Sequence, residues 1–401
     1  MRVLIADKFP ESYIDQIRGL GSQVVYEPKF GAAEIAQNIA DQDVVVVRST
    51  KVTAEAIEAS QNLSLIIRAG AGTNNIDKQA ASARGVYVAN CPGMNSIAVA
   101  ELAMGLICAL DRRIVENTLD LRNGIWNKAK YSQADGLYGK ALGVIGVGKI
   151  GAELIKRARA FGMQIKAYSR SLTPEKADAL GVEYAPSVAE LVPQCDIISV
   201  HLAATPDTEG IISEEIIDSM KPGACFINTA RAEVVDEAAL LAAVKEGRIQ
   251  VGTDLYRNEP EGKSGAVESE LGKADGVYGT HHIGASTTQA QNAVAAEVVR
   301  ILGLFLRTGR VDNWVNRLTK TPAKWQLVVR HYDKPGVLAT VLGCLKEDNV
   351  NAEEIENVIF EGALAACCTI QVDTKPSAET LEKISALKGQ VIHSELMDIT
   401  R

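Results

Sequence analysis

The sequence lacks any long apolar run: no stretch approaches the roughly 18 residues of a membrane-spanning helix. Its opening segment, MRVLIADKFP, passes from a short apolar strand pattern straight to charge and proline, unlike a secretory signal peptide. Basic residues form no run either, and the formal net charge is −8, which argues against a nucleic-acid or membrane-surface partner. We therefore expect a cytoplasmic protein that handles small molecules.

Cysteines at metal-ligand spacing are also absent. The 7 cysteines include no C-x-x-C pair, no histidine stands at ligand spacing, and an odd number does not suit a disulfide framework. We expect reduced thiols in the core and no metal site. With 47% hydrophobic and 23% charged residues, the composition is otherwise that of an ordinary globular protein.

What is present is a repeated alternation of short β-branched runs and amphipathic helices. The first runs cover residues 2–6, 22–27, 43–49, 63–70 and 85–90. Strands that are apolar on both faces and separated by helices are typical of a parallel sheet covered on both sides. A second series begins at Lys140, so we expect two doubly wound α/β domains of Rossmann or flavodoxin-like type.

Two long apolar helix patterns, at residues 97–113 and 287–309, flank the second series, and Asn95 or Ser96 could cap the first. Residues 325–401 follow a βαββαβ order, which suggests a small α+β module. The expected domains are a substrate domain (1–90 and 283–318), a dinucleotide-binding Rossmann domain (91–282), a linker (319–324) and a C-terminal domain (325–401).

The segment GVIGVGKIG contains a G-x-G-x-x-G motif between an apolar strand and a helix. In that context Gly146 permits a tight turn, Gly148 allows close approach of a pyrophosphate, and Gly151 allows close packing of helix and strand. The phosphates would rest on the N–H groups of Lys149 and Ile150 at the helix N-terminus. The alternative is a plain strand-to-helix turn, but the context favours dinucleotide binding.

The end of the next strand bears on which dinucleotide is bound. A carboxylate usually holds the ribose 2′-OH of NAD there, whereas this chain offers Ser169 and Arg170. Without a carboxylate to repel a 2′-phosphate, NADP is admissible beside NAD. Arg170 could equally be a solvated surface residue.

Three later segments resemble the D-isomer-specific 2-hydroxyacid dehydrogenase family. They are INTARAEVVDE with Arg231, GTDLYRNEP with Asp254 and Glu259, and THHIGAS with His282. Together with RAGAGTNNID, HLAATPDTEG and the glycine loop, the resemblance covers nearly all of residues 1–318. It implies a hydride transfer between a nicotinamide cofactor and a small hydroxy acid.

The resemblance also implies roles for individual residues. Arg231 would bind the substrate carboxylate and carbonyl, which suits its planar, charged guanidinium. His282 would exchange the hydroxyl proton, as a base that titrates near neutral pH can do. The carboxylate of Glu259 would orient that histidine. His281 stands where the family usually has proline, so His282 fits the catalytic position. Cofactor contacts are expected, besides His282, from Thr229, Ala230, Asp254 and Ala285.

Cations at neighbouring strand ends bear on the substrate. Arg48 and Lys51 follow one strand and Arg68 ends the next, and open α/β sheets bind ligands at that edge. Three cations exceed the need of one carboxylate and suit a phosphorylated substrate, although surface cations paired with acids would give the same pattern. The resemblance adds three substrate-side positions, Ala71, Gly72 and Asn95.

The tail segment HYDKPGVLATV resembles the start of an ACT domain, a regulatory module that binds amino acids at subunit interfaces. His331 and Asn351 match the serine-binding versions, whereas Asp333 departs from their asparagine. An ionised aspartate cannot donate a hydrogen bond to the effector, so serine remains an open expectation. The two long apolar helices each favour contact with a partner subunit, as a homodimer or homotetramer.

Two other functions compete with the oxidation or reduction of a phosphorylated hydroxy acid. A glyoxylate or hydroxypyruvate reductase of the same family would suit the loop at Ser169 and Arg170, but not the three cations or the tail. A dinucleotide-sensing corepressor or scaffold could be built on the same fold, although the tail makes that interpretation less favourable.

Overall fold

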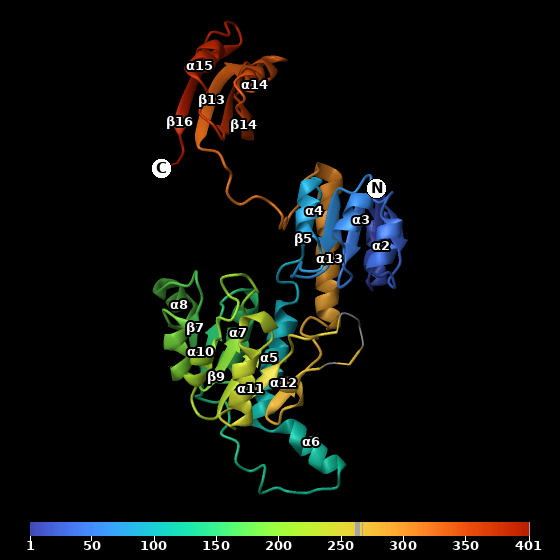
Figure 1. Cartoon of the computed structure of the whole chain (residues 1–401), viewed down its shortest axis with the longest axis vertical. Coiled ribbons are helices and arrows are strands. Elements are labelled where there is room, and N and C mark those ends of the chain that lie inside the picture. The colour runs from blue at the N-terminus through green and yellow to red at the C-terminus, as the bar shows by residue number, and fades with distance from the viewer. Residues whose placement is uncertain (261–264, 267, 401) are drawn as a thin grey trace. The chain divides into compact units, whose positions relative to one another are not determined.

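The computed structural model describes residues 1–260, 265–266 and 268–400. Their contacts divide the chain into two compact units, Met1–Asn316 and Arg317–Arg401. The first unit contains two parallel sheets and the second contains one antiparallel sheet (Figure 1). The predicted fold class, two parallel α/β domains followed by an α+β domain, is confirmed.

The first sheet has five parallel strands in the order β2-β1-β3-β4-β5, the flavodoxin-like arrangement. Its strands are β1 (Arg2–Ile5), β2 (Gln23–Tyr26), β3 (Val44–Val47), β4 (Leu65–Arg68) and β5 (Tyr87–Asn90). The helices that pack on it are α1 (Glu11–Gly19), α2 (Ala32–Asn38), α3 (Ala54–Ala59), α4 (Lys78–Ala83) and α13 (Thr288–Thr308).

Both faces of this sheet are covered, which explains the unbroken apolar sequence of β3, whose four valines are all buried. One face packs against α1 and α13, and the other packs against α2, α3 and α4. Figure 1 shows α13 running beside the first sheet although it is remote in sequence. The chain therefore returns to its first sheet, as the second long helix pattern predicted.

The second sheet has seven parallel strands in the order β12-β11-β10-β9-β6-β7-β8, which contains the Rossmann order with one strand added. Its strands are β6 (Ala141–Ile145), β7 (Gln164–Tyr168), β8 (Glu183–Tyr184), β9 (Ile197–Val200), β10 (Ala224–Asn228), β11 (Ile249–Thr253) and β12 (Val277–Gly279). Its helices are α5 (Ser96–Asp111), α6 (Ile114–Arg122), α7 (Lys149–Ala160), α8 (Pro174–Leu180), α9 (Val188–Leu191), α10 (Glu214–Asp218), α11 (Glu237–Lys245) and α12 (Glu270–Lys273). Short 3₁₀ turns cover Val192–Gln194 and Ala232–Val234.

Helix α5 differs from expectation in two respects. Asn95 occupies its N-cap position but makes no side-chain capping bond, because its φ of −102° and ψ of 5° depart from the extended backbone that a capping residue normally adopts. Ser96 lies inside the helix and does not cap it either. Most apolar residues of α5 are buried within the chain, in contact with the second sheet and α7, so its composition does not require a partner subunit.

The second unit is a four-stranded antiparallel sheet in the order β14-β15-β13-β16. Its strands are β13 (Trp325–Tyr332), β14 (Ala352–Ile359), β15 (Ala365–Val372) and β16 (Val391–Asp398). Its helices are α14 (Val337–Glu347) and α15 (Ala378–Ser385), which share one core with the sheet. The predicted βαββαβ order is confirmed.

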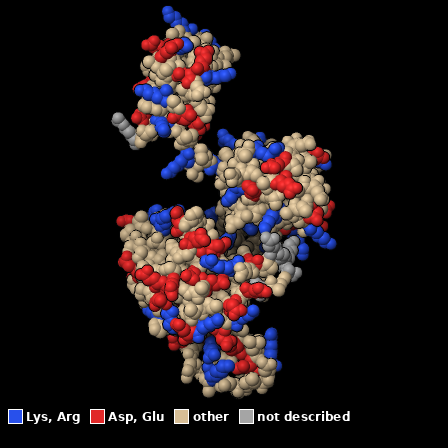
Figure 2. Space-filling model, viewed as in Figure 1, with Lys and Arg blue, Asp and Glu red and all other residues tan. Residues whose placement is uncertain are grey.

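The surface carries both signs of charge. On the face shown in Figure 2, basic and acidic side chains are interspersed. None of the described helices is long and apolar enough to cross a membrane.

Candidate active site

The loop after β12 brings His282 to Glu259. Nδ1 of His282 lies 2.7 Å from Oε2 of Glu259, and the backbone N–H of Tyr256 donates to the other carboxylate oxygen at 3.0 Å. Burial raises the pKa of Glu259, but the bonds from His282 and Tyr256 and the charge of Arg231 outweigh burial and lower it. Because the ionised carboxylate only accepts, Nδ1 must donate, and Nε2 is left to exchange a proton with a ligand.

Asp254 shapes the turn that carries His282. It is buried, and its carboxylate accepts bonds from the N–H groups of Ile283 and Gly284 at 2.9 and 2.8 Å and from the Thr280 hydroxyl at 2.5 Å. His282 itself has a φ of 51° and donates its N–H to the Asp254 carbonyl at 2.9 Å. These bonds hold a left-handed conformation that a residue with a Cβ rarely adopts. Asp254 is expected to contact the cofactor, and within the chain its carboxylate also holds the histidine loop.

Arg231 follows β10 and reaches toward the first sheet. Its Nη1 donates to the Ala230 carbonyl at 2.6 Å, and its Nη2 would lie 2.7 Å from a Cβ placed on Gly72. Any side chain at Gly72 would therefore displace the guanidinium. The two residues are far apart in the sequence but adjacent in the folded chain.

Two cavities meet at His282. We call the first, of about 470 Å³, the strand-end cavity. Its lining includes Asp7, Lys8, Arg48, Ser49, Arg68, Asn95, His282, Ala285, Ser286 and Gln291. We call the second, of about 340 Å³, the arginine cavity. Its lining includes Arg48, Ser49, Arg68, Gly72, Asn74, Asn75, Arg231, Tyr256, Arg257, Glu259 and His282.

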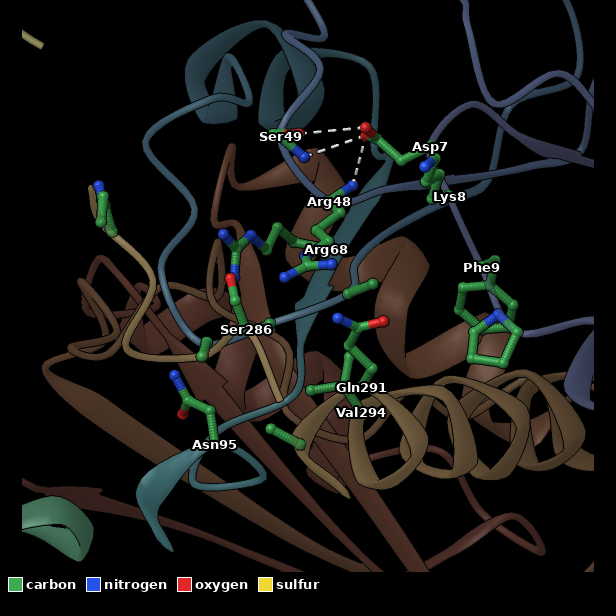
Figure 3. Close-up of a pocket in the computed structure, with 16 residues that line it drawn as sticks. Asp7, Lys8, Phe9, Arg48, Ser49, Arg68, Asn95, Ser286, Gln291 and Val294 are labelled. Atoms are coloured by element: carbon green, nitrogen blue, oxygen red, sulfur yellow. Dashed lines mark hydrogen bonds between the residues drawn. The ribbon is translucent and has the colours of Figure 1, made fainter. Parts of the chain in front are cut away.

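The shared wall of the two cavities is cationic. Burial, with the nearby charges of Arg231 and Arg48, lowers the pKa of Arg68 to about 10, so its guanidinium stays charged at neutral pH. Nε of Arg68 and Oδ1 of Asn95 are buried without a hydrogen-bond partner among the described residues. In Figure 3 both side chains, with Gln291, point into the strand-end cavity. The unpaired donor Nε of Arg68, beside the other guanidinium groups, favours an anionic ligand, whereas Oδ1 of Asn95 would accept from a donor such as a substrate hydroxyl.

The other expected substrate residues are placed less centrally. Lys51 is exposed and is not part of the lining of either cavity. Ala71 also lies outside both linings, and its carbonyl accepts a bond from Nδ2 of Asn90 at 2.5 Å. His281 is exposed, next to His282 but outside both linings.

The glycine loop has the shape that a dinucleotide requires. Gly146 has a φ of 99°, and a Cβ there would lie 2.6 Å from the carbonyl of His201. A Cβ on Gly151 would collide with the carbonyl of Gly146, whereas nothing lies within 4 Å of one on Gly148. Gly148 is the N-cap of α7, which leaves the first N–H groups of the helix facing open space. The chain therefore fits a pyrophosphate here.

Lys149 and Ile150 begin α7, behind this loop. The side chain of Lys149 crosses to the segment before α5, where Nζ donates to the Pro92 carbonyl at 2.9 Å. Its stem occupies the space that a side chain on Gly93 would need. The glycine loop is thus tied to the segment that leads to Asn95.

Of the two residues expected to bear on cofactor choice, Ser169 lines a cavity and Arg170 does not. A cavity of about 320 Å³ beside the glycine loop is lined by Val147, Ser169, Ser171, Leu172, Lys176, Ala179 and Leu180. Arg170 does not line it; its guanidinium is 88% exposed and lies 3.4 Å from Asp207. Lys176 does line it, and its Nζ donates to the Ser171 carbonyl at 3.0 Å.

Two residues that were expected to contact the cofactor follow β10. Thr229 is buried, and its hydroxyl has no partner among the described residues. Ala230 is buried and donates its N–H to Oδ1 of Asn228 at 3.0 Å. Ala285 lines the strand-end cavity.

The expected effector residues belong to the second unit. His331 is buried, with Nδ1 2.8 Å from the Tyr332 carbonyl and Nε2 3.1 Å from Oδ1 of Asn357. Asp333 and Asn351 are exposed, and Nδ2 of Asn351 donates to Glu353 at 2.6 Å. Within one chain, His331 is therefore satisfied internally.

Several lining residues were not expected from the sequence: Asp7, Lys8, Ser49, Ser286, Gln291 and Lys176. Asp7 and Lys8 follow β1 at the same sheet edge as Arg48, so the strand-end rule would have found them had it been applied to all polar residues. Gln291 lies in the first turn of α13, and no sequence pattern singled it out.

Comparison with known proteins matches residues 104–299 to the D-isomer specific 2-hydroxyacid dehydrogenase, NAD binding domain. The chain is 37% identical to the D-3-phosphoglycerate dehydrogenase of Methanocaldococcus jannaschii, over 90% of this chain and 65% of that protein. It is 45% identical to the hydroxypyruvate reductase of Thermotoga maritima, over 66% of this chain and 85% of that protein. This chain thus spans less than two thirds of the length of the Methanocaldococcus jannaschii enzyme.

A solved structure agrees with these sequence matches. NAD⁺-bound 3-phosphoglycerate dehydrogenase of Entamoeba histolytica superposes with a TM-score of 0.66 at 28% identity, covering 79% of this chain and 99% of that one. The fold, the family domain and the relatives agree. This chain belongs to the D-isomer-specific 2-hydroxyacid dehydrogenase family.

Proposed function

We propose that the chain is an NAD-dependent dehydrogenase that interconverts D-3-phosphoglycerate and 3-phosphohydroxypyruvate, the first step of L-serine biosynthesis. The observation that carries the proposal is the placing of Arg48, Arg68 and Arg231 on cavity walls that also contain His282. One guanidinium suffices for the carboxylate of a hydroxy acid, and two remain for a phosphate. Phosphoglycerate dehydrogenases among the relatives support this choice.

The residues of the site divide the work of the reaction. Arg231 binds the carboxylate of the substrate as a planar fork and polarises the C2 oxygen. In the oxidation, Nε2 of His282 takes the proton of the C2 hydroxyl while the hydride leaves C2; in the reduction it returns the proton. Glu259 holds the ring through Nδ1 and stabilises its protonated form. NAD, when bound, supplies the hydride acceptor.

The same chain offers the residues to hold NAD. The N–H groups at Gly148, Lys149 and Ile150 would receive the pyrophosphate, and the cavity at Ser169 would receive the adenosine end. Thr229, Ala230 and Ala285 would lie along the remaining path, with Asp254 acting through the histidine loop. NADP is the alternative, because no carboxylate lines the cavity at Ser169.

The proposed domains follow from the two parallel sheets. Residues 1–90 and 283–318 would form the substrate domain and residues 91–282 the cofactor domain, with closure about the segments near residues 90 and 283 expelling water. After the linker 319–324, residues 325–401 would act as an ACT-like regulatory domain. Serine is the proposed effector, and its expected residues are His331, Asp333 and Asn351, where a second copy would complete the site.

A homodimer is the proposed assembly, and α6 is the proposed contact. This helix projects from the cofactor domain (Figure 1) and exposes Ile114, Val115, Leu119 and Leu121, and the following Trp126 is 80% exposed. An apolar cluster of this kind on one projecting helix suits burial against a second chain.

The second candidate function is reduction of hydroxypyruvate without phosphate, favoured by the 45% identity to the Thermotoga maritima enzyme. Steady-state assays with 3-phosphohydroxypyruvate, hydroxypyruvate and glyoxylate, each with NADH and NADPH, separate the possibilities. We expect the highest kcat/KM for 3-phosphohydroxypyruvate with NADH. A preference for hydroxypyruvate would support the second candidate, and no turnover of any substrate would support a dinucleotide-sensing scaffold.

A further inference from the structure

Asp7 is a buried carboxylate on the wall of a cavity otherwise suited to anions. It follows β1 and is 4% exposed. The backbone N–H groups of Arg48, Ser49 and Thr50 donate to its Oδ2 at 2.7, 3.0 and 3.0 Å. The Ser49 hydroxyl donates to its Oδ1 at 3.1 Å (Figure 3).

These bonds explain how a carboxylate is tolerated beside a bound anion. Burial raises the pKa of Asp7, but the bonds from Thr50, Arg48 and Ser49 outweigh burial and lower it, so the group stays ionised. Backbone and side-chain donors of residues 48–50 converge on its two oxygens, so the negative charge is directed at that segment. It is therefore stabilised locally and presents little repulsion to a ligand.

The backbone that Asp7 holds carries two lining residues. β1 and β3 are adjacent parallel strands, so Asp7 and the segment after Val47 emerge at the same edge of the sheet. Arg48 and Ser49 line both the strand-end cavity and the arginine cavity. Because the N–H groups of three successive residues bond to one oxygen, a shift of that oxygen would turn both side chains.

We propose that Asp7 is a positioning residue that sets affinity for the substrate's second anionic group, the one distal to the carboxylate, by fixing the directions of Arg48 and Ser49. The inference rests on the proposed function and extends it, because Asp7 acts through the loop rather than on a reacting atom. Its effect should therefore fall on the KM of a phosphorylated substrate and leave the chemical step alone.

The test compares Asp7→Asn with Asp43→Asn in the full chain. Asp43 is a matched control, since its carboxylate also accepts a backbone N–H across β1 and β3, from Arg2 at 2.7 Å, but at the opposite end of the strands. In Asp7→Asn the KM for 3-phosphohydroxypyruvate should rise about tenfold, the factor of one charge-assisted hydrogen bond. The KM for hydroxypyruvate and the kcat for both substrates should stay near wild type, and Asp43→Asn should change neither KM.

Several outcomes would overturn the inference. An equal loss with both substrates, accompanied by a lower Tm, would make Asp7 a purely structural residue, and an unchanged KM would leave it without a role in affinity. If Asp7→Asn does not fold, Asp7→Glu keeps the charge, displaces the loop, and should give the same selective rise. The same selective rise in Asp43→Asn would assign the effect to general loosening of the sheet.

Failure of the proposed function is distinguishable from failure of this inference. If the wild-type chain does not use 3-phosphohydroxypyruvate, the affinity for inorganic phosphate is measured instead, by inhibition of whichever substrate is turned over or by the shift of Tm. Asp7→Asn should weaken the binding of inorganic phosphate about tenfold, and Asp43→Asn should leave it unchanged. Equal phosphate affinity in all three proteins would overturn the inference whatever the substrate.

Discussion

Nδ1 of His282 lies 2.7 Å from a carboxylate oxygen of Glu259, a residue 23 positions away in the sequence. The pair is fixed from both sides, because Tyr256 donates to Glu259 and the Asp254 carboxylate holds the turn after His282. Nδ1 is thereby hydrogen-bonded within the protein, and Nε2 is available to the substrate. The proposed acid–base chemistry depends on this difference between the two ring nitrogens.

Replacing the two adjacent histidines separates their roles. His282→Ala should lower kcat about 10²- to 10⁴-fold, the usual contribution of a positioned acid–base group, and His281→Ala should stay near wild type because it lines neither cavity. Steady-state kinetics with NADH measures both. Normal turnover in His282→Ala, with a large loss in His281→Ala, would reverse the assignment.

Glu259 should couple stability to pH. Although burial raises its pKa, the bonds from His282 and Tyr256 lower it below that of the unfolded chain. A lowered folded pKa stabilises the protein above the unfolded pKa, and this contribution is lost as the pH falls through the folded value. The difference in free energy of unfolding between wild type and Glu259→Gln, followed by urea denaturation, should therefore shrink toward acid pH. A difference that grows toward acid pH would contradict the assignment.

Gly151→Ala tests the glycine loop as a structural requirement of cofactor binding. The added methyl group would meet the Gly146 carbonyl, so strand and helix must separate, at a cost of about 1–3 kcal/mol in stability. Calorimetric titration with NADH should show binding lost or greatly weakened in the folded variant. Gly105→Ala, where nothing lies within 4 Å of the added group, is the matched control. Unchanged NADH affinity in Gly151→Ala would remove the loop from the cofactor site.

Cofactor choice should depend on Lys176 more than on Arg170. Lys176 lines the cavity at Ser169, whereas Arg170 is exposed beside Asp207. We expect NADH to be preferred, and Lys176→Ala to lower the residual kcat/KM for NADPH about tenfold, as the loss of one phosphate contact implies. Arg170→Ala is the comparison and should change the NADPH to NADH ratio little. The opposite ranking of the two variants would restore Arg170 as the selecting residue.

Much of the fold followed from periodicity. Runs such as VVVV in β3 have apolar residues on both faces, which only a covered parallel sheet satisfies. The glycine spacing likewise specified one tight turn, and Gly146 adopts the positive φ that it implied. The apolar sequence of α5 does not distinguish cover by a neighbouring sheet from cover by a second chain, and in the structure the second sheet and α7 cover most of its apolar residues.

The site was predictable only where a motif or a strand end marked it. Arg48 and Arg68 lie as the strand-end rule predicts, but Lys51, three residues beyond Arg48, lines neither cavity. The conformation of the loop after β3 decides which of its side chains line a cavity, and no local pattern encodes it. Asp7 was not predicted because its partners are backbone N–H groups about 40 positions away, and backbone groups leave no pattern in the sequence.

The central claim is that guanidinium groups at the ends of β3 and β4 select a phosphorylated substrate. It is tested most directly by the ratio of kcat/KM for 3-phosphohydroxypyruvate over hydroxypyruvate, with NADH, in the wild type and in Arg48→Ala. We expect a wild-type ratio of about 10² or more, because two charge-assisted contacts hold the phosphate, and a fall of about tenfold in the variant. A wild-type ratio near one, or a ratio that Arg48→Ala leaves unchanged, would contradict it.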